Sequence, residues 1–407
     1  MPASSATDTP RSGHPPVGLI LTGGGARAAY QVGVLSAVME ILDPQRNRGL
    51  VNPFPIICGT SAGAINAAAL ACRAHDPHKA ADRLVHFWSS LHTGQIYHGD
   101  TGRLLRTGIR WLALLAFGWM APGLRQRSPR SLLDNSPLRR LLAESLDFDH
   151  LAENLDAGHL TALAVTASAY TTGEHITFYQ SGQRIKPWRR TLRHAEPAQI
   201  GVEHLLASSA IPFVFPAQSL TAKGHTYWCG DGSMRQLAPI SPAIHLGARK
   251  IFVIGTGFRD ETHPEEGEKM PDYPSLAQIG GHALANIFLD SISMDIERAD
   301  SINELLAQIS GNGLQIDSLR PISTFAVTPS QSLDAIALRH LTQLPKAARA
   351  LFRVLGVSAT QGANRGGSLI SYLLFEAAYT RELIELGRAD CLSRTEEVKA
   401  FFKEAQE

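Results

Sequence analysis

Residues 56–64 have the sequence IICGTSAGA, in which an apolar run meets a Gly-x-Ser-x-Gly pentapeptide. The apolar run predicts a buried strand, and the alanine-rich stretch after it predicts a helix. Such a strand-to-helix turn is typical of a nucleophile elbow, which lifts the serine hydroxyl above the sheet edge. The positive end of the helix favours negative charge near Ser61. We therefore expect Ser61 to be a nucleophile. The elbow that carries it consists of Gly59, Thr60, Ala62 and Gly63.

The pentapeptide alone also fits a turn that merely packs a strand against a helix. Upstream, a second strand-to-helix turn is predicted: an apolar stretch at 17–21, then TGGGAR at 22–27, then helical apolar spacing at 32–42. Successive glycines allow backbone amides to point at an anion. Two anions fit: a dinucleotide pyrophosphate and the oxyanion of an acyl-transfer intermediate.

The dinucleotide alternative depends on Gly23-x-Gly25-x-x-Ala28, a degenerate Rossmann fingerprint. That fold also needs an acidic residue at the end of a second strand, about 20 positions further on. Here Glu40 and Asp43 fall at the end of the predicted first helix, and the next strand leads into the serine elbow. The oxyanion therefore fits the glycine loop better.

Composition excludes several classes of function. The 407 residues carry a net charge of +1, which argues against a nucleic-acid partner. The four cysteines have neither CxxC nor Cys/His spacing, so we expect reduced thiols, no disulfide framework, no metal and no cofactor. At 44% hydrophobic and 18% charged residues, the chain is typical of one large α/β domain with appendages, or of two domains.

The chain has no predicted secretory or membrane-spanning segment. Residues 1–16 are polar and Pro-rich, which predicts a disordered leader. Residues 111–120 are apolar with a tryptophan at 111 and 119, and arginines flank them across 103–130. This segment is either a lid or interfacial anchor, or a buried core helix. We expect a cytoplasmic protein with possible peripheral membrane contact.

Strand and helix patterns alternate through most of the chain. Residues 160–170 and 175–180 flank a hairpin signal, and 250–254 is a short apolar strand. This alternation predicts an α/β fold whose mostly parallel central sheet is covered by helices on both faces. We expect a catalytic domain at 17–273 and a mainly helical region at 274–407 packed on it. Within that region we expect helices at 279–309, 333–355 and 369–386 and a strand at 322–327.

An acidic residue, Asp231, follows the strand pattern of residues 227–229 and lies between two glycines, which allow a tight turn. It is the candidate partner of Ser61. An ordinary hydrolase triad would instead need a histidine after the acid. The four candidates lack a strand-end or glycine-rich context: His245, His263, His282 and His340.

Three blocks therefore stand in order: the glycine loop, the elbow and Asp231-Gly232. Together with the apolar wall at 207–216, they resemble the patatin-like phospholipase family over about residues 17–257. The resemblance implies a Ser61–Asp231 dyad without histidine, supported by Gly232. It places the oxyanion hole at Gly23, Gly24, Gly25, Ala26 and Arg27. Two positions depart from the family pattern: Ala28 replaces a glycine, and Ser233 replaces glycine or alanine.

The resemblance implies a lipid acyl hydrolase acting on a lipid or another acyl ester. Asp231 would accept the proton of Ser61, which requires a dry site that raises the carboxylate's basicity. Arg27 could fix the loop through an ion pair, contact a lipid phosphate or remain solvated. The same acyl-enzyme would serve an acyltransferase, and a catalytically inactive lipid-binding scaffold is a third alternative. The oligomeric state stays open.

Overall fold

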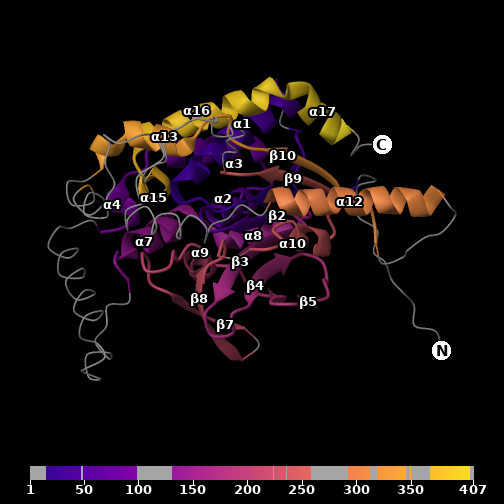
Figure 1. Cartoon of the computed structure of the whole chain (residues 1–407), viewed down its shortest axis with the longest axis horizontal. Helices are drawn as coiled ribbons and strands as arrows, with labels where there is room; N and C mark the ends of the chain where they lie inside the picture. The colour runs from indigo at the N-terminus through magenta and orange to yellow at the C-terminus, as the bar shows by residue number, and fades with distance from the viewer. Residues whose placement is uncertain are drawn as a thin grey trace, which may run out of the picture.

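The computed structural model describes residues 15–46, 49–98, 131–222, 224–234, 236–257, 292–311, 319–344, 349 and 367–403. The leader at 1–14, the segment at 103–130, His263 and His282 lie outside these residues. The described chain forms a ten-stranded sheet with helices on both faces (Figure 1). The predicted fold class is thus confirmed.

Five parallel strands run inward from one edge of the sheet, in the order β10-β9-β1-β2-β3. Antiparallel pairing joins β3 to both β4 and β8, and β8 to β7. The strands are β1 (Val17–Leu21), β2 (Ile56–Thr60), β3 (Ala162–Ala169), β4 (His175–Ser181), β5 (Arg189–Arg190), β6 (Arg193–Pro197), β7 (Gln218–Ala222), β8 (His225–Asp231), β9 (Lys250–Ile254) and β10 (Ser323–Val327).

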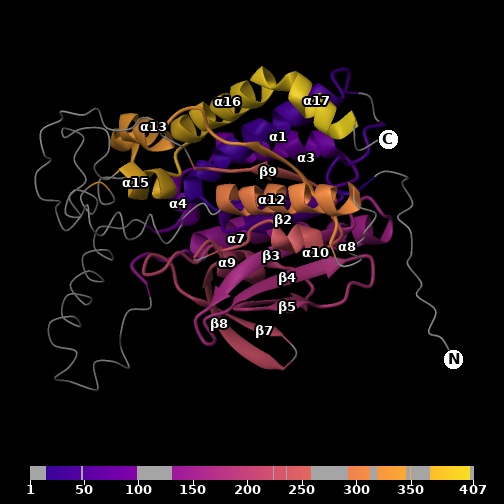
Figure 2. The ribbon, with the colours of Figure 1, turned by 45° about the vertical axis from the view of Figure 1, so that its right-hand side comes forward.

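One face of the sheet carries the larger hydrophobic core. The elements there are η1 (Gly25–Ala28), α1 (Ala29–Leu42), α2 (Ala62–Ala71), α3 (Pro77–Ser89), α4 (Thr93–Ile96), α7 (Ser136–Ser145), α8 (Phe148–Asp156), α13 (Leu333–Arg339), α15 (Gly367–Leu373), α16 (Ala377–Ser393) and α17 (Thr395–Lys403). Alanines in α2 allow its backbone to approach the sheet closely. Helix α16 lies along α1, so α1 is buried on nearly every side (Figures 1 and 2).

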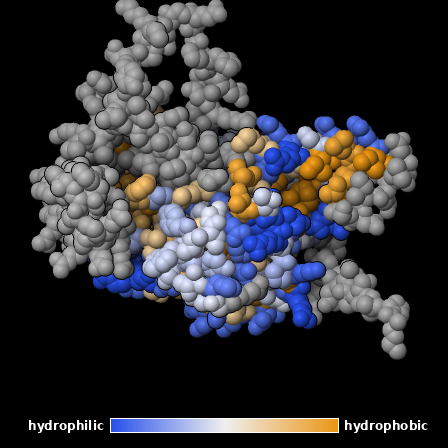
Figure 3. Space-filling view, turned by 60° about the horizontal axis from the view of Figure 1, so that its bottom comes forward, coloured by the Kyte–Doolittle hydropathy of each residue, from blue (hydrophilic) through white to orange (hydrophobic). Residues whose placement is uncertain are grey.

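In the described part of the chain, the opposite face is covered by α10 (Ser241–His245) and α12 (Ile292–Gly311). The Ile240 N–H donates to Asp295 Oδ2 at 3.1 Å, which ties the start of α10 to α12. Along α12, Met294, Ile302 and Leu305 are exposed, and they form an apolar area on an otherwise mostly hydrophilic face (Figure 3). None of the described helices is long and apolar enough to span a bilayer.

Two of the helices predicted from sequence are shorter than expected. Within the helix predicted at 333–355, α13 ends at Arg339, and extended backbone follows at Leu344 because Pro345 disfavours the helical conformation of the residue before it. Residues 345–348 and 350–355 of this prediction lie outside the described residues. The helix predicted at 369–386 is two helices, α15 and α16, separated at residues 374–376. The break occurs where Phe375 stacks on Trp88, so a tertiary contact overrides local helical spacing.

Candidate active site

Ser61 lies on the turn between β2 and α2, as the elbow pattern predicts. Its backbone has φ 55° and ψ −130°, a strained conformation that non-glycine residues rarely adopt. A Cβ at Gly63 would lie 2.3 Å from the Leu21 carbonyl oxygen, and one at Gly59 would lie 2.5 Å from the Gly63 carbonyl oxygen. Larger residues at these two positions would therefore force the elbow apart.

The sheet brings Asp231 to the serine from 170 residues further along the chain. Thr60, at the end of β2, is opposite Thr166 of β3, and the next residue of β3, Ala167, is opposite Asp231 at the end of β8. The Ser61 hydroxyl donates to Asp231 Oδ2 at 2.6 Å. The two residues that the sequence paired are thus in direct contact.

The dyad is held by hydrogen bonds from the surrounding backbone and side chains. The Ser233 N–H donates to Asp231 Oδ1 at 2.8 Å, so both carboxylate oxygens are engaged. The Ser61 N–H donates to Ser208 Oγ at 2.8 Å, and that hydroxyl donates to the Thr166 carbonyl at 2.6 Å. Ser208 ends α9 (Val202–Ser208), so this helix links the elbow to β3.

The dyad is dry, since Ser61 is 3% exposed and Asp231 is 0% exposed. Burial raises the pKa of the Asp231 carboxyl to about 6, against the smaller lowering effects of the hydrogen bonds from Ser61 and Ser233. A carboxylate with a pKa near neutrality is a far better general base than an exposed aspartate. The environment therefore provides the basicity that the proposed dyad chemistry requires.

The glycine loop lies beside the elbow. The Thr256 hydroxyl donates to the Gly23 carbonyl at 2.7 Å, and Gly24 caps the 3-10 turn η1. Gly25 has φ 55° and lines the same cavity as Ser61. The Arg27 N–H donates to the Gly24 carbonyl at 3.1 Å, so this amide is used within the loop. Of the loop residues predicted for the oxyanion hole, Gly25 thus lines the cavity that Ser61 lines. The next residue, Ala26, is fully buried.

The Arg27 side chain joins the glycine loop to the C-terminal helices. Its Nη2 pairs with Asp334 Oδ1 of α13, and its Nε donates to Ser371 Oγ of α15 at 2.8 Å. Ser371 in turn donates to Asp334 Oδ1 at 2.6 Å, and the guanidinium lies 4.2 Å from the Tyr372 ring centroid. Of the three roles considered for Arg27, the structure shows the ion pair.

A buried polar network supports the loop from the helix side. Asn66 of α2 donates from Nδ2 to the Ala28 carbonyl at 3.1 Å and to Gln31 Oε1 at 3.0 Å. Trp88 of α3 donates to Asn66 Oδ1 at 2.8 Å. Gln31 completes the chain by donating to the Thr22 carbonyl at 2.8 Å. Because its members satisfy one another, this network fixes α1, α2 and α3 around the glycine loop.

A small apolar cavity opens beside Ser61. Its volume is about 30 Å³, about the volume of one water molecule in the liquid. The wall segment contributes Ile211 and Phe215, while Phe213 of the same segment is 61% exposed. Phe375, between α15 and α16, also lines the cavity. Sequence reasoning missed Phe375, Asp334, Ser371 and Tyr372, because no motif marks them.

The two departures from the family pattern both fit the site. Ala28 is fully buried at the end of η1. The hydroxyl of Ser233 is buried and has no partner in hydrogen-bonding geometry among the described residues. It lies 1.9 Å from where a Cβ would stand on Gly23, so a side chain there would displace this hydroxyl and crowd Ser61 Cβ at 3.1 Å. A Cβ on Gly232 would similarly lie 2.0 Å from the Thr166 carbonyl oxygen, which explains the glycine after the acid.

No histidine is among the described residues that line the cavity. His245 stacks on Trp188 with ring centroids 4.7 Å apart, and burial together with nearby arginines lowers its pKa to about 4. His340 contacts Glu382 at 2.6 Å on the C-terminal helices. Within the described ranges no cluster of three or more His, Cys, Asp or Glu side chains could hold a metal ion.

This geometry defines an α/β protein with a serine elbow, a facing aspartate and a glycine loop. The family model for patatin-like phospholipases matches residues 19–244, which is more than half of the chain. The chain belongs to the patatin-like phospholipase family. The match includes β1, the glycine loop, the elbow and Asp231, and it ends within α10. No curated protein matches the sequence.

Solved structures with low sequence identity are also similar. Human GIVD cytosolic phospholipase A2, in complex with methyl gamma-linolenyl fluorophosphonate inhibitor and terbium chloride, is 13% identical with a TM-score of 0.43. The match covers 96% of this chain and 60% of that one. VipD from Legionella pneumophila is 14% identical with a TM-score of 0.32, over 91% of this chain and 67% of that one.

Proposed function

We propose that this protein is a lipid acyl hydrolase that cleaves fatty acyl esters through a Ser61–Asp231 dyad. The observation that carries the proposal is the 2.6 Å hydrogen bond from Ser61 Oγ to a fully buried Asp231 carboxylate. Family membership supports a lipid ester as the class of substrate. The apolar side chains that line the small cavity beside the serine suit the carbonyl end of a fatty acyl group.

The reaction would run in two halves. Asp231 Oδ2 takes the hydroxyl proton as Ser61 Oγ attacks the ester carbonyl. Backbone amides of the glycine loop and the start of α2 stabilise the oxyanion, a contribution of roughly 3 kcal/mol for each donor. The proton passes to the leaving alcohol, and water then hydrolyses the acyl-enzyme with Asp231 again as the base. Each step uses only groups already in contact or adjacent.

An acyltransferase would form the same acyl-enzyme, but an alcohol would attack it in place of water. An inactive lipid-binding scaffold would have no need of a strained elbow or of a carboxylate whose pKa is raised toward neutrality, because both cost folding free energy. The intact dyad therefore favours an enzyme over a scaffold.

The test measures p-nitrophenol release from a medium-chain p-nitrophenyl ester, together with labelling by a fluorophosphonate probe. Wild type is expected to be active and labelled, Ser61→Ala inactive and unlabelled, and Asp231→Asn slower by roughly a thousandfold. Ser219→Ala, an exposed serine of β7, is the matched control. Wild-type protein that is unlabelled and inactive on both esters and phospholipid vesicles would overturn the proposal. Product analysis with an added lysophospholipid acceptor separates hydrolysis from transfer.

A further inference from the structure

A second cavity lies next to the catalytic one, between α2, α3 and α7. It has a volume of about 340 Å³. The two cavities share two wall residues, Ile65 of α2 and Phe87 of α3. A third pocket, of about 580 Å³, lies on the other face of the sheet and shares no lining residue with the catalytic cavity. Ile65 and Phe87 therefore lie between the α2–α3–α7 cleft and the cavity that Ser61 lines.

One face of α2 runs from the nucleophile along this cleft. Ile65, Ala69 and Cys72 follow Ser61 at intervals of four, four and three residues, which places them on one side of the helix. All three line the cleft. Helix α7 follows the same course, because Leu138 lines the catalytic cavity and Leu142, one turn later, lines the cleft.

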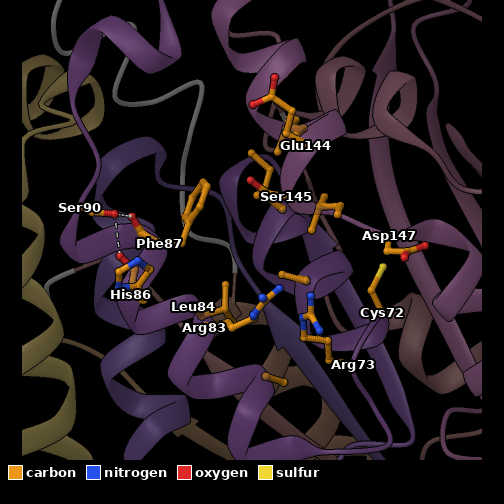
Figure 4. Close-up of a pocket in the computed structure, with 15 residues that line it drawn as sticks. Cys72, Arg73, Arg83, Leu84, His86, Phe87, Ser90, Glu144, Ser145 and Asp147 are labelled. Atoms are coloured by element: carbon orange, nitrogen blue, oxygen red, sulfur yellow. Dashed lines mark hydrogen bonds between the residues drawn. The ribbon is translucent and has the colours of Figure 1, made fainter.

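The cleft has an apolar floor and apolar walls, and it is also lined by polar or charged side chains, among them His86, Ser90, Glu144 and Ser145. Leu84, Phe87 and Leu142 form the walls beside the α2 face. At the rim, Arg73 and Arg83 lie near one another, with Asp147 across from them (Figure 4). Burial raises the pKa of the Cys72 thiol to about 12, so the floor near Arg73 is uncharged at neutral pH. An apolar trough that ends in charge suits a hydrocarbon chain of limited length.

The catalytic cavity alone is too small for such a chain, since its 30 Å³ holds about one water-sized group. An acyl group on Ser61 must therefore extend past one of the cavity walls. Phe87 is a partly exposed side chain that borders the cleft, whereas Trp88 and Leu91, which also line the cavity, are 2% exposed. Displacing the Phe87 ring thus disturbs the core least.

We propose that the α2–α3–α7 cleft holds the acyl chain of the substrate, with Phe87 and Ile65 as the partition that the chain crosses and Ala69 as its floor. The inference rests on the proposed esterase function and adds the acyl chain's path and length. Helix α2 advances about 16 Å between Ser61 and Cys72. An extended hydrocarbon advances about 1.3 Å per carbon, because its bonds of about 1.5 Å zigzag. The charged rim therefore sets the preferred length at about 12 carbons.

The experiment compares initial rates on p-nitrophenyl butyrate, octanoate, dodecanoate and palmitate. Wild type is expected to prefer octanoate and dodecanoate over palmitate. Ala69→Phe fills the trough, so the dodecanoate-to-butyrate rate ratio should fall roughly tenfold or more while the butyrate rate is kept. Phe87→Ala removes the partition, and the same ratio should rise several-fold. Two substitutions with opposite effects distinguish a chain site from a general loss of folding.

Ala143→Phe is the matched control, because Ala143 is exposed on α7 and does not line the cleft. Its chain-length profile should equal that of wild type. Should Ala69→Phe melt at a lower temperature than Ala143→Phe, Ala69→Leu replaces it with less added volume. Unchanged chain-length ratios in folded Ala69 and Phe87 variants would overturn the chain site and leave the esterase intact. A wild type that cleaves none of these esters, is not labelled by the fluorophosphonate probe and is inactive on phospholipid vesicles would instead overturn the proposed function, and the inference with it.

Discussion

The dyad and the Arg27 anchor differ in how the chain builds them. Ser61 follows β2 and Asp231 ends β8, and both strands pair with β3, inside the part of the chain that the family model matches. Arg27 also lies in that part, but its partners Asp334 and Ser371 lie outside it. The chemistry therefore comes from recognisable motifs, whereas the loop beside the nucleophile is held by residues that no motif identifies.

The dyad and the Arg27 anchor also differ in how much folding stability is lost when one of their residues is replaced. The Arg27 side chain is 11% exposed and that of Asp334 is 28% exposed, so breaking the pair leaves a largely buried cation without its partner. Such a loss is strongly destabilising, by about 3–5 kcal/mol for a fully buried pair. Because Asp334 is partly exposed, we expect a smaller loss of folding stability here. We expect the glycine loop to be the part of the structure that is most affected.

Among changes outside the dyad, the largest effect is expected for the anchor. Asp334→Asn should lower kcat by roughly 10–100-fold, because a shift of about 1 Å in the oxyanion loop misplaces its amides. The pH profile should keep its shape, since Asp231 is untouched. The measurement is kcat and KM for a p-nitrophenyl ester across pH, with thermal melting to follow folding.

Arg388→Gln is the matched control for the anchor. It breaks an exposed ion pair between the same two regions, Arg388 to Glu40 at 2.7 Å, and should change kcat little. Equal effects of Asp334→Asn and Arg388→Gln on kcat would mean that the Arg27–Asp334 pair only helps to dock the C-terminal helices and does not position the glycine loop.

A smaller effect, about tenfold, is expected from pH on the dyad itself. With the Asp231 pKa at about 6, the rate should rise with pH through 6 and level off above it. At one pH unit below the pKa only about a tenth of the carboxyl is ionised, so kcat/KM should be about tenfold lower there. A profile that instead rises through pH 4 would show that burial does not raise the pKa of this carboxyl.

The same shift has a defined sign for stability. The folded-state pKa of Asp231 lies above its ordinary value of 3.8, so its contribution is fully present below pH 3.8 and is lost as pH rises through 6. Asp231→Asn cannot ionise. Its melting temperature relative to wild type should therefore increase between pH 5 and pH 8, and a constant difference over that range would contradict the raised pKa.

The smallest effect is expected at Ser233. Ser233→Ala keeps the backbone N–H that holds Asp231 Oδ1 and removes a buried hydroxyl that makes no hydrogen bond in good geometry among the described residues and only helps to lower the Asp231 pKa. The rate should change less than about threefold, and stability should stay equal or rise, because an unsatisfied buried hydroxyl is unfavourable. Steady-state rates and melting curves check this. A tenfold loss in kcat would give the hydroxyl a part in the reaction.

Local patterns predicted much of the fold. The strands at 17–21 and 250–254, the hairpin of β3 and β4 and the helix after the elbow follow from apolar runs, turn residues and spacing. The strand predicted at 322–327 is β10, which extends the parallel sheet beyond β9. The C-terminal helices were predicted less well, because their ends depend on Pro345 and on the packing of Phe375 against Trp88.

The sequence by itself determined the residues of the candidate site, because an elbow, a glycine loop and an acid at a strand end are each encoded within a few neighbouring positions. Only the tertiary structure decided what surrounds them. It buried Asp231, paired Arg27 with Asp334 and placed the α2–α3–α7 cleft beside Ser61. These features join residues far apart in sequence, and burial, ion pairing and cavity shape are properties of the packed chain that local spacing does not encode.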